Sequence, residues 1–389
     1  MPFDFDAVVS RRGTGCVKWD RPEEGVLPLW VADMDFQAAP AIIEALHRRV
    51  DDGVFGYALP PASWHESLAR WLAKRHAWTV DPDTILNSIS VLPALAAVIR
   101  AFCRPGDQVV LQTPAYNGFL HVIRDQGCEI AGSPLRRIPA KTEGDFTYEM
   151  DYEDLDRKLA DPRAKLLLIC NPHNPVGRVW TADELKRAGE IALRHGVFMV
   201  SDEIHADLQM PGSRHTPFAT VSDAFPAASA TFWSASKAFN LAGLQTAAVI
   251  CANPAIRAKI RKAQVMNGTG DLNPFGFLAA STAWDRCADW LDALRVYLHG
   301  NYQTLLEFVH THLPRLQVAT LEATYLAWVD VNALGLPSGE LAHRLEQQAK
   351  VKFAPGSDYA EPPGSAFLRI NLATSRAILL DALNRLSKG

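Results

Sequence analysis

The chain has 389 residues, of which 48% are hydrophobic and 21% are charged, as in a globular protein large enough for two domains. Its formal net charge of −4 argues against binding to nucleic acid or to an anionic membrane surface. No apolar run approaches the roughly 20 residues of a membrane span, and the N-terminus lacks the basic start and apolar core of a signal peptide.

The six cysteines are scattered, and no two form a Cys-x-x-Cys pair. Neither a disulfide framework nor a zinc site is therefore expected. We predict a cytoplasmic protein.

The first predicted helices lie in the N-terminal part of the chain. Pro40 is expected to begin a helix that ends near Asp51, and the apolar spacing is helical again over residues 64–78. Tyr57 lies in the loop between them. The predicted buried face of the first helix carries Ile43, Leu46, His47 and Val50.

Residues 85–88 are predicted to form a short strand that turns directly into a helix near Val91 and Leu92. The unpaired N–H groups and the positive end of the helix dipole favour an anion there, phosphate above all. The segment has no glycine-rich cradle, so an ordinary strand–helix junction is the competing interpretation.

Polar side chains follow three further predicted strands. Tyr116 comes just after the strand at 108–111, at the edge where open α/β sheets bind ligands, although its ring can also simply pack on the loop. The strand at 165–170 breaks into Asn171-Pro-His-Asn174-Pro-x-Gly-Arg178, in which the prolines hold the asparagine amides rigidly.

The strand at 197–201 leads into Asp202 and His205. These two side chains have the chemistry of metal ligands, but no third ligand with companion spacing is apparent, and a metal site is not favoured.

A β-prone run at 231–233 leads into Ser234-Ala-Ser236-Lys237. A lysine in a partly dry pocket has a lowered pKa and becomes an amine nucleophile that forms Schiff bases with carbonyl cofactors. A surface lysine after an edge strand is the alternative.

Strand, loop and helix alternate from about residue 85 to 250, as in a parallel sheet covered on both faces. The pattern then changes to long helices, strands near 324–331 and 367–372, and a helix near 338–349. We predict a large domain at 47–285 and a smaller α+β domain at 286–389, to which residues 1–46 contribute.

Five motifs carry a family resemblance. In chain order they are Tyr116, Asn171–Arg178, Ser201–His205, Ser234–Lys237 and Arg369. Together they resemble the fold-type I enzymes that use pyridoxal phosphate (PLP), the aspartate aminotransferase superfamily. Segments 11–14, 17–20 and 29–36 further resemble the MalY/PatB cystathionine β-lyase branch. The resemblance implies an α/β fold with a mainly parallel seven-stranded sheet.

The same resemblance implies how the cofactor is held. Lys237 would bind PLP covalently, Asp202 would pair with its pyridine nitrogen, and Tyr116 would stack on its ring and assist the departing sulfur. The phenolate oxygen would be held by Asn174 and His205, and the phosphate by Val91, Leu92 and Ser234. Ser236 would also contact the cofactor. Tyr57 would reach the phosphate of the neighbouring subunit, which implies a homodimer with shared sites.

The expected substrate is an amino acid. Arg369 would clamp its carboxylate bidentately, with Asn174 and Trp30 beside it, and Lys237 would take the Cα proton. Eight residues after this lysine, aminotransferases usually carry an arginine on the phosphate, whereas this chain has Gln245.

The resulting prediction is β-elimination of cystathionine or a related L-cysteine S-conjugate to a thiol, pyruvate and ammonia. An aminotransferase with the same cofactor is the alternative. A binding or regulatory role without turnover is a further one, against which the presence of Lys237 and Asp202 argues.

Overall fold

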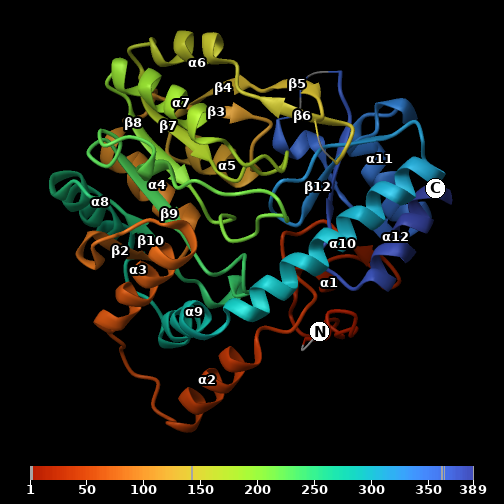
Figure 1. Cartoon of the computed structure of the whole chain (residues 1–389), viewed down its shortest axis with the longest axis horizontal. Coiled ribbons are helices and arrows are strands. Elements are labelled where there is room, and N and C mark those ends of the chain that lie inside the picture. Colours follow the sequence, from red (N-terminus) through yellow and green to blue (C-terminus); the bar gives the residue numbers. More distant parts are fainter. Residues whose placement is uncertain (1–2, 142, 361, 363, 389) are drawn as a thin grey trace.

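The computed structural model describes residues 3–141, 143–360, 362 and 364–388. A seven-stranded sheet forms the centre of the larger part of the molecule (Figure 1), in the strand order β2-β10-β9-β8-β7-β3-β4. All neighbouring strands are parallel except for the two pairs that include β10. The strands are β2 Ile85–Ser88, β3 Gln108–Thr113, β4 Glu129–Pro134, β7 Ala164–Cys170, β8 Phe198–Asp202, β9 Ser229–Trp233 and β10 Ala247–Ile250. The predicted mainly parallel seven-stranded sheet is confirmed.

Helices cover both faces of this sheet, which explains the continuous apolar runs of its strands. Side chains alternate between the faces, so Leu167 and Ile169 belong to one core cluster whereas Leu166 and Leu168 belong to another. The first cluster includes α6 Tyr152–Leu159 and α7 Ala182–Arg194, and the second includes α4 Val91–Phe102, α5 Asn117–Asp125 and α8 Pro254–Asn267. The capping box of Thr181 and Glu184 begins α7.

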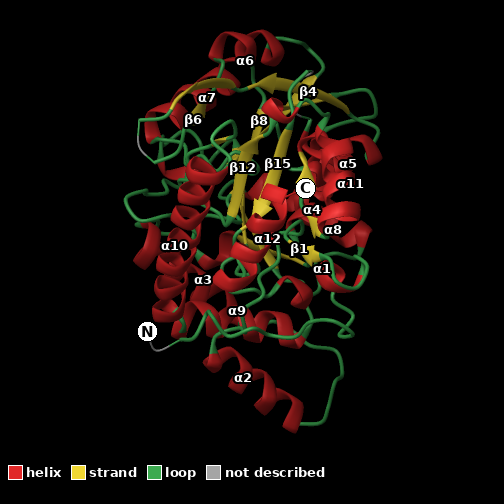
Figure 2. Ribbon diagram, turned by 90° about the vertical axis from the view of Figure 1, so that its right-hand side faces the viewer, coloured by secondary structure: helices red, strands yellow, loops and turns green. Residues whose placement is uncertain are grey.

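The C-terminal part of the chain forms a second, antiparallel sheet in the order β11-β12-β15-β14. Its strands are β11 Gln317–Val318, β12 Leu326–Asp330, β14 Ala354–Pro355 and β15 Phe367–Asn371. The helices of this part are α10 Ala288–His312, α11 Ser338–Arg344 and α12 Arg376–Lys388, and a π-helical turn, Leu345–Ala349, continues α11. Figure 2 shows β12 and β15 side by side near α12.

The N-terminal segment joins this second part. Strand β1, Leu27–Pro28, pairs in parallel with β13, Val351–Lys352, and follows the short helix α1, Val17–Asp20. This pairing supports the prediction that the first residues contribute to the smaller domain, although the domain boundaries themselves stay a prediction. A hairpin, β5 Arg136–Pro139 with β6 Phe146–Glu149, lies outside both large sheets.

Helix α2, Pro40–Asp51, has the predicted bounds but not the predicted buried face. Its buried residues are Ile42 and Ala45, whereas His47 and Val50 are exposed. The reason is that α2 packs mainly on α9, Pro274–Arg286, and extends away from the rest of the molecule at the bottom of Figure 1. Helix α3, Ala62–His76, packs on the same partner.

No helix in the described ranges is both long and apolar enough to cross a bilayer. The carboxyl ends of β2, β3, β7, β8 and β9 reach a common edge of the large sheet. Arg369 of β15 belongs to the facing small sheet. The predicted cofactor residues other than Tyr57 follow these strand ends.

Candidate active site

A cavity of about 160 Å³ lies at this edge of the sheet. Its walls include most of the predicted cofactor residues, namely Val91, Leu92, Tyr116, Asn174, Asp202, His205, Ser236 and Lys237. Gln245 also lines it. Two predicted residues, Ser234 and Tyr57, are not part of its wall.

Lys237 is not a surface lysine. It follows the end of β9, its side chain is largely buried, and burial lowers the pKa of its amine to about 8, with the positive charge of Arg369 acting in the same direction. The Nζ atom donates a hydrogen bond of 2.7 Å to the carbonyl oxygen of Ala32. A fraction of this amine is therefore neutral near pH 7, as a nucleophile or base requires.

Asp202 ends β8 and is buried without a positively charged partner. Burial raises the pKa of its carboxyl to about 7, and the carboxylate accepts a hydrogen bond from the Ile204 N–H at 3.2 Å. Among the described residues it forms no ion pair within 4.0 Å. A buried carboxyl of this kind fits a ligand that brings its own protonated nitrogen.

His205 stands beside the same cavity as a neutral imidazole. Burial, together with the positive charges of Lys237 and Arg369, lowers its pKa to about 3. Its Nδ1 is buried with no hydrogen-bond partner in the described part of the chain. It is therefore available to a polar atom of a ligand.

Arg369 extends from the small sheet toward the cavity and is 4% exposed. Its guanidinium donates to the Asn174 side-chain oxygen at 3.1 Å and to the Trp30 carbonyl at 2.8 Å, and it lies over the ring of Tyr359 at 4.7 Å. Its Nε is buried and has no partner within the described ranges. The group is thus fixed in place while its Nε–H donor stays unused.

The start of α4 offers backbone donors. Its N-cap residue, Ser90, makes no side-chain capping hydrogen bond, so the first amides of the helix, at Val91 and Leu92, are open to an anion. Ser236 lines the cavity near them.

Ser234 does not line the cavity. Its hydroxyl lies 2.6 Å from the Thr246 carbonyl oxygen, to which it can only donate, and it accepts from the Ser236 N–H at 3.0 Å. These two hydrogen bonds fix the turn that places Ser236 in the cavity wall. The predicted contact of Ser234 with the phosphate stays a prediction.

Tyr57 does not reach the cavity of its own chain. It is fully exposed, in the loop that joins α2 to α3 at the projecting lower end of Figure 1. Its predicted role needs a second subunit.

A wider cavity adjoins the first and shares Ala32, Tyr116 and Lys237 with it. Trp30 and Arg369 line its inner side, as predicted for substrate-binding residues. Four ionisable side chains also line it, namely His343, Glu346, Lys352 and Asp358. Lys352 pairs with Glu346 at 2.8 Å and lies 5.1 Å from the Trp30 ring centroid.

Two asparagines with a role near the site were missed. Asn240 donates to the carbonyls of Met34 and Phe36 at 3.1 and 2.9 Å, and Asn371 donates to those of Val31 and Asp33 at 2.6 and 2.7 Å. The sequence held weak signals for both. Asn240 ends the Lys237 motif in a left-handed conformation (φ 57°), and Asn371 follows Arg369 by two residues on one strand face.

In the described part of the chain no group of three or more His, Cys, Asp or Glu side chains is placed to hold a metal ion. The cavity instead suits a planar ligand with a carbonyl, a basic ring nitrogen and a phosphate, because it offers an amine, an unpaired carboxyl and open helix amides. On a mainly parallel sheet of this kind, those features are typical of PLP-dependent enzymes of fold type I.

Comparison with known proteins agrees with this class. A family model described as aminotransferase class I and II matches residues 24–386. The chain is 43% identical over 389 residues to cystathionine beta-lyase PatB of Bacillus subtilis (strain 168), with 99% of each covered. It is 34% identical over 388 residues to protein MalY of Escherichia coli (strain K12), with 97% of this chain and 96% of that protein covered.

Among solved structures, cystalysin from Treponema denticola matches with a TM-score of 0.94 and 33% identity, over 100% of this chain and 98% of that one. The crystal structure of cystalysin contains a pyridoxal 5'-phosphate cofactor. The chain thus belongs to the aminotransferase class I and II family and, within it, to the MalY/PatB branch. The resemblance inferred from its motifs is confirmed.

Proposed function

We propose that this chain is a PLP-dependent carbon–sulfur lyase that cleaves cystathionine or a related L-cysteine S-conjugate to a thiol, pyruvate and ammonia. The observation that carries the proposal is the end-to-end similarity, at 43% identity, to a protein named cystathionine beta-lyase. Gln245 in the cavity wall, where aminotransferases usually carry an arginine, points the same way.

The cavity residues account for cofactor binding. Asp202, without a cation of its own, would pair with the pyridine nitrogen and keep it protonated. The phenolate oxygen would be held by Asn174 and His205, and the phosphate by the amides of Val91 and Leu92 and by Ser236. PLP supplies an acceptor for the electrons released when a bond to the substrate Cα breaks.

Lys237 has two tasks in this proposal. It would hold the cofactor covalently when no substrate is bound, and it would remove the Cα proton of the bound substrate. Both tasks need a neutral amine, and burial lowers the pKa of Lys237 to about 8. The Ala32 carbonyl is the hydrogen-bond acceptor for the free amine.

The substrate would be oriented by its carboxylate. Arg369 has an unused Nε donor, and its contacts with Asn174 and with the Trp30 carbonyl hold it in place. The sulfur-bearing side chain would then extend into the wider cavity. Tyr116 lines both cavities, and burial raises the pKa of its hydroxyl, so it stays protonated and is suited to give a proton to the departing thiolate.

An aminotransferase is the second candidate, since the family model is described by that activity. Both reactions begin with loss of the Cα proton, so the same lysine and carboxyl serve each. The test is to incubate the protein with cystathionine, with and without a keto acid. Pyruvate, ammonia and free thiol should form without keto acid, and the Lys237→Ala variant should release almost none.

Product that forms only when a keto acid is supplied, with no thiol released, would replace the lyase by the aminotransferase. Normal turnover by Lys237→Ala would instead remove the lysine from the mechanism.

We also propose that the chain works as a homodimer in the cytoplasm. The support for the dimer is the exposed apolar surface of the α2–α3 loop, in which Val54, Phe55 and Leu59 accompany Tyr57. Large exposed apolar patches usually mark an interface, and a two-fold axis would bring Tyr57 of one subunit toward the site of the other. The six cysteines are free thiols, as in a reducing compartment.

A further inference from the structure

Residues 30–36, here named the crossing segment, contain no helix or strand, yet side chains from elsewhere accept or donate at almost every peptide. Six of its carbonyl oxygens accept a hydrogen bond from such a side chain. The pairs are Trp30 with Arg369, Val31 and Asp33 with Asn371, Ala32 with Lys237, and Met34 and Phe36 with Asn240.

These side chains come from both parts of the molecule. Arg369 and Asn371 belong to β15 of the small sheet, whereas Lys237 and Asn240 follow β9 of the large sheet. The crossing segment therefore joins the proposed carboxylate-binding arginine to the proposed reactive amine. Any displacement of the segment would change the hydrogen bonds of both Arg369 and Lys237.

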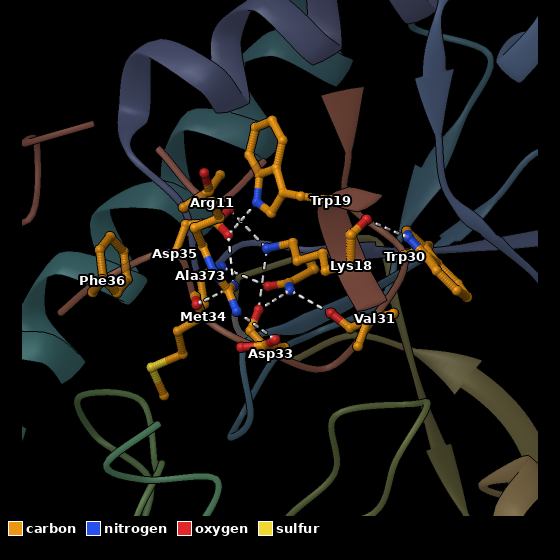
Figure 3. A network of polar contacts seen from close by, with 12 residues as sticks. Arg11, Lys18, Trp19, Trp30, Val31, Asp33, Met34, Asp35, Phe36 and Ala373 are labelled. Carbon is orange, nitrogen blue, oxygen red and sulfur yellow. Dashed lines mark hydrogen bonds and ion pairs between the residues drawn. The ribbon is translucent and has the colours of Figure 1, made fainter. Parts of the chain in front are cut away.

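One side chain of the crossing segment, Asp35, ties the segment to residues 11–19 of the chain. Asp35 is 4% exposed and accepts from Lys18 Nζ at 2.8 Å, from Trp19 Nε1 at 2.7 Å and from Arg11 Nη1 at 3.1 Å. Figure 3 shows these three groups converging on Asp35. Its backbone N–H is also bonded, to the Ala373 carbonyl at 2.9 Å.

Lys18 contributes a second tie. Its side chain is fully buried, and its Nζ donates to the Asp33 carbonyl at 3.1 Å as well as to Asp35. A buried ion pair is weak evidence for a purely stabilising role, because desolvation offsets much of the attraction. Lys18 and Asp35 both hold the crossing segment in place. Their ion pair is therefore better explained by the groups that this segment positions than by stability alone.

We propose that Lys18 and Asp35 are positioning residues that fix the crossing segment, and through it set the Ala32 carbonyl against the amine of Lys237 and the Trp30 carbonyl against Arg369. The proposal rests on the function proposed above for Lys237 and Arg369. Neither Lys18 nor Asp35 lines the two cavities, so neither touches the substrate or the cofactor.

Displacement of the two carbonyls should affect kcat and KM separately. When the Ala32 carbonyl shifts, the free amine loses its acceptor and kcat falls. When the Trp30 carbonyl shifts, Arg369 loses one of its two fixed contacts and KM rises. A residue that only stabilises the fold would change neither value at a temperature where the variant stays folded.

The test compares Asp35→Asn, Lys18→Met and the double variant, each with the cofactor bound. Thermal unfolding reports stability, and the absorbance of the lysine-bound cofactor, titrated against pH, reports the surroundings of Lys237 without any turnover. The charged groups nearest that amine are Asp33, Asp202 and Arg369, none of which is altered. Trp19→Phe, which removes a single hydrogen bond to Asp35, is a milder variant that keeps the test independent of folding.

Arg137→Met is the matched control. It breaks the ion pair of Arg137 with Asp330, on residues that line neither cavity. It should lower the unfolding temperature while kcat/KM stays within about twofold of the parent and the absorbance titration is unchanged.

The positioning role predicts at least a tenfold loss of kcat/KM and a shifted titration in Asp35→Asn and in the double variant. The double variant should regain unfolding temperature over Asp35→Asn, because that single variant leaves Lys18 as a buried cation without its carboxylate, but it should not regain activity. Recovery of activity together with stability, or variants with the parent's titration, would overturn the proposal. A parent chain with no lysine-bound cofactor absorbance would instead overturn the proposed function, and this proposal with it.

Discussion

His173 and His205 are buried next to the strand ends of the large sheet, and both are neutral for the same reason. Burial is the largest cause that lowers their pKa values, to about 4 and about 3. His173 donates a hydrogen bond from Nε2 to the Pro114 carbonyl oxygen at 2.8 Å, so this nitrogen carries the proton of the neutral imidazole. Each histidine therefore resists taking a second proton as long as the chain is folded.

This resistance makes the fold sensitive to acid. Above pH 6.5 both histidines are neutral in the folded and the unfolded chain. As the pH falls from about 6.5 to about 4, the two histidines bind protons in the unfolded chain but stay neutral in the folded chain. The free energy of unfolding therefore decreases. Each histidine should account for about 1.4 kcal/mol per pH unit in that window.

The measurement is the denaturant midpoint from pH 7.5 to 4.5, for the parent and for His173→Gln. A glutamine can still donate to the Pro114 carbonyl but cannot titrate. The free energy of unfolding of the variant should therefore fall less steeply with decreasing pH, and the difference in slope should correspond to the uptake of about one proton. Equal slopes for the two proteins would show that His173 does not titrate in this way.

At the scale of elements, the N-terminus of α4 carries a specific prediction. Proline at the first helical position keeps the helix but removes one N–H, and Ser90 before it is already extended (φ −168°, ψ 178°), as proline requires. Val91→Pro should therefore weaken PLP binding by roughly ten- to a hundredfold, since a hydrogen bond to a charged group contributes about 1.5–3 kcal/mol.

Val91→Ala is the matched control, because it trims the same buried side chain and keeps the N–H. Dissociation constants for PLP, from a spectroscopic titration of each variant, decide the matter. If the proline and alanine variants bind PLP equally well, the Val91 amide does not hold the phosphate.

The sequence was most informative for elements with a strong local signal. The continuous apolar runs of β7 and β8 and the capping box of α7 are such signals. The apolar run of β8 also predicts the place of Asp202, because this residue ends the buried strand. The predicted buried face of α2 was wrong because α9, the helix on which α2 mainly packs, decides which residues are covered. A helix pattern does not reveal how many neighbours a helix has.

The contacts of the crossing segment could not be predicted for a different reason. Lys237 donates to the backbone carbonyl of Ala32. Because every residue has such a carbonyl, the identity of residue 32 does not indicate this contact. The partners are also more than 200 residues apart in the chain. Only the folded arrangement of the two sheets brings them together.

At the scale of the whole molecule, the projecting loop between α2 and α3 implies a partner. Val54 is 70% exposed and Leu59 is 89% exposed, an arrangement that costs solubility unless the surface is covered. A single chain has a mass of 42.8 kDa, and we predict that light scattering of the purified protein will give twice that value.

Charge placed in the loop should separate the subunits. Leu59→Asp would put a carboxylate into the apolar contact, so it should shift the protein toward monomer and weaken PLP binding by removing the partner's Tyr57 from the site. Val296→Asp is the control, since Val296 is likewise exposed, at 58%, but lies on α10. It should leave the dimer and its activity unchanged.

Tyr57→Phe separates assembly from cofactor binding. It removes only the hydroxyl that would reach the phosphate, so the dimer should persist while PLP binds more weakly. A hydrogen bond to a charged group contributes about 1.5–3 kcal/mol, which corresponds to roughly a ten- to hundredfold change in the dissociation constant. A parent protein that is monomeric and fully active would contradict the shared site, because an exposed Tyr57 cannot then reach any cavity.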